Sequence, residues 1–166
     1  MQRYPYNFES DTREAKMTTA LLQSPGPLLS QLIEAQRLEE EAVRYPQIEK
    51  WADALVTHAK QLPGFLIWPV GAPAERIAGV ATARARGRIE VGLWNAPVDG
   101  RTILLFAVAG VTPLSLTLTA EQLRRRGAGD VHACGIAITG VASADGIESF
   151  RSLADDLAHP ANARAA

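Results

Sequence analysis

The sequence predicts an α/β fold in which a parallel β-sheet is covered by helices on both faces. Short apolar runs alternate along the chain with segments that have helical spacing. The apolar runs are hydrophobic throughout and do not alternate with polar residues, as is typical of strands buried on both faces of a parallel sheet. A length of 166 residues fits a single domain with a sizeable core.

Two helices are expected before the first strand. The segment "PLLSQLIEAQRLEEEAVRY", which begins at Pro27, carries apolar residues along one face and predicts an amphipathic helix to about Val43. A second helix is expected after Pro46, because proline is favoured in the first turn of a helix. Its apolar stripe keeps the spacing of a buried helix face: Ile48, Trp51, Ala52, Leu55 and Ala59.

The rest of the chain is expected to alternate strands with helices. The predicted strands are 64–70, 88–94, 102–109 and 130–138. Helices are predicted after the first and the third strand, and the second of these, "SLTLTAEQLRRRG", is closed by Gly127. A closing helix is predicted from "SADGIE", where Asp145 and Glu148 have capping-box spacing, to about Ala158. These elements indicate a Rossmann-like parallel sheet flanked by helices.

The chain is expected to have three parts. Residues 1–25 show no sustained apolar period and end in the breaker cluster "SPGP", so they predict a flexible N-terminal arm. Residues 26–158 form the single α/β domain, and 159–166, "HPANARAA", form a C-terminal tail.

Composition argues against several classes of partner. A formal net charge of −1 gives no electrostatic support for binding to nucleic acid or to a membrane. The single cysteine, Cys134, excludes an internal disulfide, and no Cys/His spacing suits zinc. The first residues are polar and include acids, unlike a signal peptide, and no apolar run is long enough to cross a bilayer. A cytoplasmic location is expected.

Two loops follow the carboxyl ends of predicted strands, where open parallel sheets bind ligands: 70–76 and 108–115. The segment "ILLFAVAGVTPLSLTLTAEQLRRRGA" resembles the signature of type I phosphoribosyltransferases, V-L-L-V-D-D-V-I-T-T-G-A-T-L followed by a helix. Upstream, "FLIWPVGAPAERIAGVATARA" is similar to the first strand, pyrophosphate loop and helix of that family. The two N-terminal helices resemble those of orotate phosphoribosyltransferase-like members, so the resemblance covers roughly residues 27–140.

The resemblance implies a phosphoribosyltransferase-like fold that holds a phosphate-bearing small molecule between the two loops. Thr112 and Ser115 match hydroxyl-bearing positions of the family's phosphate loop. The family commonly dimerises, which implies a homodimer, and a protein partner is a further expectation. The candidate ligand-binding residues are Gly71, Ala72, Glu75, Arg76, Gly110, Val111, Thr112 and Ser115.

Three departures from the family pattern argue against transfer chemistry. Adjacent carboxylates hold the ribose hydroxyls in the family, and Ala107 and Val108, which stand there, accept no hydrogen bond through their side chains. Pro113 replaces the usual glycine, which fixes φ negative and removes an N–H donor. Only "NAPVDGR" joins the second and third strands, where the family has a long mobile lid. We therefore expect a degenerate member that serves as a binding, regulatory or scaffolding module, with no catalytic residue, no metal site and no cofactor.

Two alternatives stay open. The chain could be an active phosphoribosyltransferase that uses phosphoribosyl pyrophosphate with Mg²⁺ and an unusual loop, with Glu75 as the substitute acid. It could also be an unrelated Rossmann-like domain that shares only the general βαβ pattern. A strand order of 3-2-1-4 is expected for the family, and another order for an unrelated domain.

Structural roles compete with functional ones for the remaining polar and aromatic residues. Glu75 and Arg76 suit a solvated first helical turn, and the cations 124–126 suit a helix C-terminus. His132 and Cys134 face one side of a strand, where core packing is favoured over a nucleophilic pair. Trp68 and Trp94 are expected at the carboxyl ends of strands, where each could stack on a ligand ring or meet a partner.

Overall fold

The structure of the chain is a computed structural model that describes residues 27–61, 64–138 and 146–158. The chain divides into two units, and the boundary falls between Glu34 and Ala35, inside the first described helix. The sheet, its flanking helices and the candidate site all belong to the second unit. The predicted arm 1–25 and tail 159–166 lie outside the described residues, so both remain predictions.

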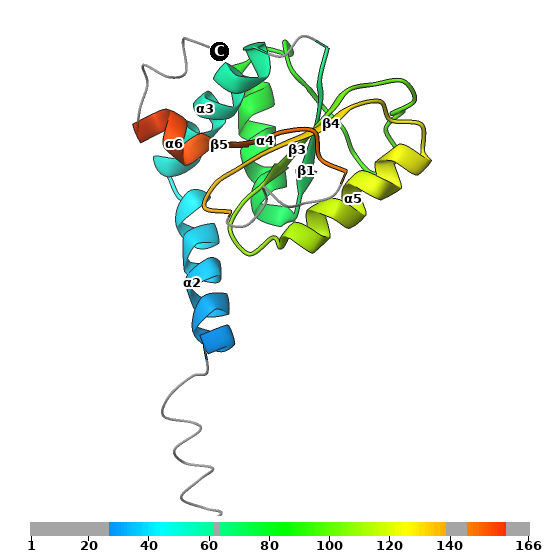
Figure 1. Ribbon diagram of the computed structural model, residues 1–166. Helices are drawn as coiled ribbons and strands as arrows, with labels where there is room; N and C mark the ends of the chain where they lie inside the picture. Colours follow the sequence, from blue (N-terminus) through cyan, green and yellow to red (C-terminus); the bar gives the residue numbers. More distant parts are fainter. Residues whose placement is uncertain (1–26, 62–63, 139–145, 159–166) are drawn as a thin grey trace, which may run out of the picture. The chain divides into compact units, whose positions relative to one another are not determined.

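Five parallel strands form one sheet in the order β2-β1-β3-β4-β5 (Figure 1). The central strand, β3, is completely buried, because all five of its residues are apolar. It pairs along its full length with β1 and β4. The predicted α/β class with a Rossmann-like parallel sheet is confirmed. The strands are β1 Leu66–Val70, β2 Glu90–Val91, β3 Ile103–Ala107, β4 Val131–Gly135 and β5 Phe150–Ser152.

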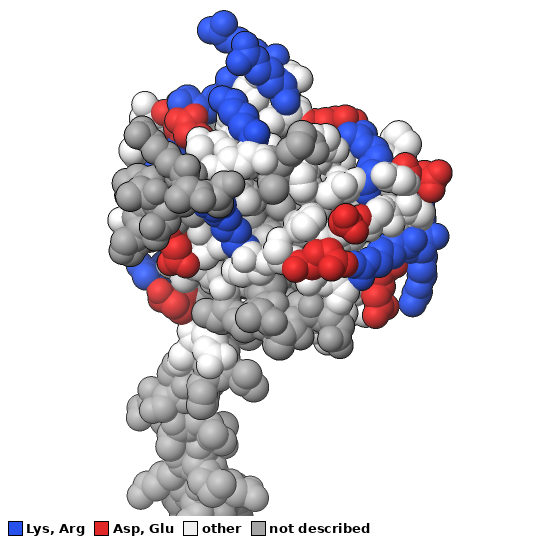
Figure 2. All heavy atoms as spheres, turned by 45° about the horizontal axis from the view of Figure 1, so that its top comes forward, with Lys and Arg blue, Asp and Glu red and all other residues white. Residues whose placement is uncertain are grey.

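Helices cover both faces of the sheet, as the fully apolar strands require. The helices α3, α4 and α6 pack on one face, and α5 packs on the other (Figure 1). The helices are α2 Pro27–Ala42, α3 Gln47–Gln61, α4 Ala72–Arg84, α5 Pro113–Arg125 and α6 Leu153–Ala158. Figure 2 shows charged side chains of both signs on one side of the molecule, with Lys and Arg projecting at the top of the view.

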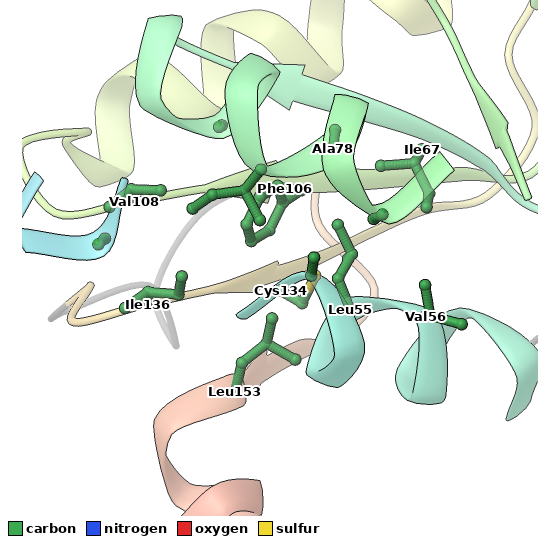
Figure 3. Packing of buried hydrophobic residues seen from close by; sticks show 14 of the residues in the cluster. Leu55, Val56, Ile67, Ala78, Phe106, Val108, Cys134, Ile136 and Leu153 are labelled. Atoms are coloured by element: carbon green, nitrogen blue, oxygen red, sulfur yellow. The ribbon is translucent and has the colours of Figure 1, made fainter. Parts of the chain in front are cut away.

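Two hydrophobic cores lie on the two faces of the sheet. In the first core, Leu55 of α3 and Leu153 of α6 meet Ile67 and Phe106 of the strands (Figure 3). The end of α2 joins this core through the buried Ala42. In the second core, α5 contributes residues at helical spacing, which pack on the opposite side of β1, β3 and β4: Leu116, Ala120 and Leu123.

The predicted second strand is too long. Strand β2 has two residues where 88–94 was predicted. Gly92 is buried against Trp68, and a Cβ on this glycine would lie 2.7 Å from the Trp68 ring, so the chain passes close over the tryptophan. A turn follows, in which the Ala96 amide donates to the Leu93 carbonyl at 2.8 Å.

The predicted closing helix is also wrong in its first part. The Glu148 amide donates to the Val131 carbonyl, and the Ser149 carbonyl accepts from the Ala133 amide, both at 2.8 Å. These backbone groups are committed to the sheet and lead into β5, so the helix begins only at Leu153. Asp145 lies outside the described residues, and the Glu148 carboxylate pairs with Arg124 at 2.8 Å.

The strand order differs from the 3-2-1-4 order expected for the family. The third strand of the chain, β3, lies beside β1 and not beside β2. A fully apolar strand gains most from a central place, paired on both sides and covered on both faces, whereas the two-residue β2 suits an edge. The expected order 3-2-1-4 is therefore wrong for this chain.

Candidate functional site

The observed strand order sets the topological switch point between β1 and β3. In a sheet of order 2-1-3-4-5, the connections leave these two strands toward opposite faces, and ligands bind in the crevice beyond their carboxyl ends. Both predicted loops, 70–76 and 108–115, begin there, because Val70 pairs with Ala107. The loops also meet, since a Cβ on Gly71 would lie 4.0 Å from the Val111 side chain.

The loop after β1 turns sharply into α4. Gly71 has a φ of 91°, a conformation that favours glycine, and it caps α4 without a side-chain hydrogen bond. Its carbonyl accepts a hydrogen bond from the Glu75 amide at 3.1 Å. The side chains of Ala72, Glu75 and Arg76 are exposed, and neither charged group has a partner among the described residues. This arrangement fits a solvated first turn.

The loop after β3 begins inside the core. Ala107, Val108 and Ala109 are 0%, 1% and 2% exposed. Val108 lies in the first core near Ile136 (Figure 3). Ala107 lies in the second core. The two positions at which the family resemblance expects acids are apolar by residue type. The structure adds that both are closed to solvent.

Polar groups at the start of α5 form hydrogen bonds with one another. The Thr112 hydroxyl caps the helix by accepting from the Ser115 amide at 3.2 Å, and the two hydroxyls lie 2.9 Å apart. Pro113 occupies the first helical position and has no N–H to donate. The Ser115 amide is already used by Thr112, so Leu114 is the one residue of the first three helical positions whose amide is left as a donor. An anion held here would lose most of the donors that a helix N-terminus normally offers.

A carboxylate from α2 faces the same loop. Gly110 has a φ of 90°, and a Cβ on it would lie 2.6 Å from Oε1 of Glu39 and 3.8 Å from the Ala35 side chain. Burial raises the pKa of Glu39 above its ordinary value. Among the described residues no cation pairs with this carboxylate. The sequence pattern predicts an amphipathic helix to about Val43 and does not single out Glu39.

The connection 92–102 is held against the far end of α5. Val98 is buried in the second core, the Gly100 amide donates to the Gly127 carbonyl at 2.7 Å, and Arg126 donates to the Ala96 carbonyl at 2.6 Å. These anchors lie at the C-terminal end of α5, while the phosphate-type loop precedes its N-terminal end. The connection therefore makes a fastened turn, as its length predicts.

The other sequence candidates take structural partners. Arg124 pairs with Glu148, Arg125 with Glu121 at 3.4 Å, and Arg126 stacks over the Trp68 ring at 5.2 Å.

His132 and Cys134 also lie apart from the candidate crevice. The Nδ1 atom of His132 is 2.8 Å from the Ser149 hydroxyl, and its ring meets the Phe65 ring edge-on. Cys134 is buried in the first core. Trp68 lies in the middle of β1 and is partly buried, contrary to the expected strand end, and Trp94 is 84% exposed beyond β2.

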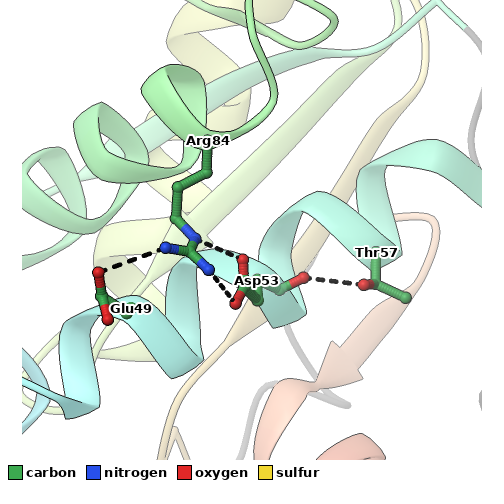
Figure 4. A network of polar contacts seen from close by, with 4 residues as sticks. All are labelled: Glu49, Asp53, Thr57 and Arg84. Atoms are coloured by element: carbon green, nitrogen blue, oxygen red, sulfur yellow. Dashed lines mark hydrogen bonds and ion pairs between the residues drawn. The ribbon is translucent and has the colours of Figure 1, made fainter.

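A polar network joins α3 to α4 away from the candidate crevice. Arg84, in the last turn of α4, donates to both carboxylate oxygens of Asp53 at 2.6 Å and to Glu49 at 3.3 Å (Figure 4). The hydrogen bond with Asp53 is the main cause that raises the pKa of Arg84 above its ordinary value. This network ties the two helices together at the opposite end of α4 from Gly71, so its role is structural.

The described residues contain neither a cluster of metal-ligating side chains nor a membrane-spanning helix. Within 27–61, 64–138 and 146–158, no three His, Cys, Asp or Glu side chains gather as a metal site. None of the helices described there is both long and apolar enough to span a bilayer.

The geometry defines an α/β domain in which buried apolar residues, a self-capped helix and the Glu39 carboxylate lie at the switch point of the sheet. No family model and no curated protein matches the chain. Among solved structures it is similar to a hypoxanthine-guanine-xanthine phosphoribosyltransferase, with 14% sequence identity, a TM-score of 0.44 and coverage of 63% of this chain and 73% of that chain. A likeness of this size carries no argument about function, and the α/β fold stands on the strand pairing itself.

Proposed function

We propose that this chain is a degenerate phosphoribosyltransferase-like domain that has lost transfer chemistry and acts as a binding, regulatory or scaffolding module. The proposal rests on the loop resemblance around 102–128 and on the state of the residues at its key positions. The observation that carries it is the pair Ala107 and Val108, which are apolar and fully buried where the resemblance expects two adjacent acids that hold ribose hydroxyls.

The phosphate loop supports the same conclusion. A phosphate beside Gly110 would face the Glu39 carboxylate, and two like charges that lie close together without a cation repel each other. The first turn of α5 offers few free donors, because Pro113 lacks one and Thr112 caps another. Residual phosphate or nucleotide binding would therefore have to use the loop after β1, with Gly71, Ala72, Glu75 and Arg76.

The active-enzyme alternative has one specific feature in its favour. Glu75 is an exposed acid in the first turn of α4, and its amide donates a hydrogen bond to the Gly71 carbonyl. It stands alone there, whereas the family pattern requires two adjacent acids and a metal-bound substrate. We therefore place this alternative second, with Mg²⁺ as its cofactor. The unrelated-domain alternative makes the same prediction about transfer activity.

A transfer assay tests the proposal. The full chain is incubated with phosphoribosyl pyrophosphate, Mg²⁺ and either orotate or a purine base, and released pyrophosphate is measured. We expect release at the rate of the protein-free control. Pyrophosphate release that depends on the base and is abolished in Glu75→Gln would establish the active-enzyme alternative.

A thermal-shift screen separates binding from catalysis. Phosphoribosyl pyrophosphate, nucleoside monophosphates, pyrophosphate and phosphate are each tested with and without Mg²⁺, because a ligand that binds only the folded state must raise the melting temperature. A response to monophosphates alone would support a sensor. A Mg²⁺-dependent response to the pyrophosphorylated sugar would contradict the proposal. The cytoplasmic location and the homodimer stay predictions.

A further inference from the structure

A cleft lies at the edge of the sheet opposite the candidate crevice. It has a volume of about 260 Å³ and is bounded by the end of α3, the start of β1 and the segment that enters β2. Its floor is apolar and partly or fully buried, and its rim carries two exposed cations. The lining residues are Ala59, Lys60, Gly64, Phe65, Ile67, Arg88 and Ile89.

The two cations of the cleft have no counter-ion within the described residues. Neither Lys60 nor Arg88 makes a side-chain hydrogen bond or ion pair there. Glu90, two residues after Arg88 in the chain, is instead held by both terminal nitrogens of Arg101 at 2.8 and 2.7 Å. The two acids of α3 that face α4, Glu49 and Asp53, are likewise engaged by Arg84 (Figure 4). The described residues around the cleft therefore leave its positive charge uncompensated.

We propose that this cleft binds a small organic anion. The anionic group would lie between Lys60 and Arg88, and the apolar body would cover Phe65, Ile67 and Ile89. Pairing two cations with one anion gives charge-assisted hydrogen bonds, and the floor supplies the apolar contact that most ligand sites use. The volume exceeds the ~10–15 Å³ that one water needs but falls short of the ~300–1,000 Å³ typical of drug-sized ligands, so the ligand is small.

This inference is independent of the proposed loss of transfer chemistry. The cleft lies at the amino-terminal ends of the strands, whereas the proposed function concerns loops at their carboxyl ends.

Calorimetric titration of the full chain with phenyl phosphate tests the inference, because this probe joins an apolar ring to an anion. Inorganic phosphate and phenol serve as half-probes that carry one feature each. We expect saturable binding of phenyl phosphate that is tighter than the binding of either half-probe. Lys60→Gln and Arg88→Gln should each weaken it by about three- to tenfold, as expected for loss of one partly exposed charged hydrogen bond.

Matched variants locate the binding. Arg125→Gln removes the same charge from an exposed position on α5 that is remote from the cleft, and it should leave the affinity unchanged. Ile89→Ala should weaken phenyl phosphate and not inorganic phosphate, because only the ring uses the floor. Circular dichroism confirms that each variant is folded.

Three results would overturn the inference. They are the absence of saturable binding, wild-type affinity in both Lys60→Gln and Arg88→Gln, and equal affinity for phenyl phosphate and inorganic phosphate. Binding that is lost in Arg76→Gln and kept in Lys60→Gln would locate the anion at the carboxyl edge. That outcome would reject the cleft while supporting residual phosphate binding at the loop after β1.

Discussion

Replacing Val108 with aspartate tests whether the carboxyl end of β3 is open to solvent or packed with apolar side chains. If the crevice were open, as in an enzyme that holds a sugar there, an acid at this position would be solvated and well tolerated. In the structure Val108 is 1% exposed and packs in the first core. An acid in its place would be buried without a partner.

The expected loss of stability can be worked out from this burial. Losing the apolar contacts of the valine costs about 1.5 kcal/mol. Keeping the new carboxyl neutral at neutral pH, against an ordinary pKa near ~3.9, costs about 4 kcal/mol more, at roughly 1.4 kcal/mol per pH unit. The sum of about 5–6 kcal/mol approaches the total stability of many domains, which is ~5–15 kcal/mol.

The sign of the pH dependence follows from the raised pKa of the buried group. The folded variant binds a proton that the unfolded chain releases above its ordinary pKa, so stability falls as pH rises. Near the ordinary carboxyl pKa, the loss relative to wild type should shrink to about 1.5–2 kcal/mol. Urea unfolding followed by circular dichroism, in acidic and in neutral buffer, measures both values.

Two control variants make the test specific. Val108→Thr changes polarity at similar volume without a charge, so its smaller loss should not depend on pH. Leu114→Asp introduces the same acid at a position that is 65% exposed in the first turn of α5, where the helix dipole favours it. It should stay within about 0.5 kcal/mol of wild type. Wild-type stability of Val108→Asp in both buffers would refute the closed crevice.

Three further predictions concern the loop and the surface. Gly110→Ala should cost about 1–3 kcal/mol of stability, because alanine is strained at the positive φ of this residue. The added methyl group would also crowd Glu39, and Glu39→Ala in the same chain should relieve that part of the loss. A double-mutant cycle of unfolding free energies measures this coupling. Thr112→Ala should lower stability by about 1 kcal/mol through loss of the helix cap, as measured by urea unfolding, and an unchanged midpoint would speak against the cap. The hydrogen bond with Arg101 lowers the pKa of Glu90 below its ordinary 4.5, so this pair stabilises the fold above that pH and is lost as pH falls through the lowered value. Glu90→Gln should therefore cost about 0.5 kcal/mol at neutral pH and nothing in strong acid, and a pH-independent difference would contradict this account.

The sheet was predictable because the strongest strand signals are local. The run "ILLFA" of β3 is apolar throughout, and burial on both faces follows directly from that pattern. The length of β2 was not predictable, because it depends on Gly92 passing over Trp68, a contact between residues of neighbouring strands. Strand β5 has three residues, too few to show a period.

The sequence predicts where the candidate site lies but not how deeply its residues are buried. The positions of the two loops follow from the βαβ pattern, and the lost acids are visible as Ala107 and Val108. The burial of those two residues depends on tertiary packing, which no local pattern reports. The carboxylate of Glu39 at Gly110 comes from a helix about seventy residues earlier in the chain. Sequence periodicity assigns such a residue to a helix face and says nothing about what it meets.

Calorimetric titration of the full chain with phosphoribosyl pyrophosphate and Mg²⁺ tests the central claim most directly. The account predicts only heat of dilution, because the carboxyl end of β3 carries buried apolar residues in place of the paired acids that would hold the sugar. Saturable one-to-one binding that requires Mg²⁺ and disappears in Glu75→Gln would contradict it.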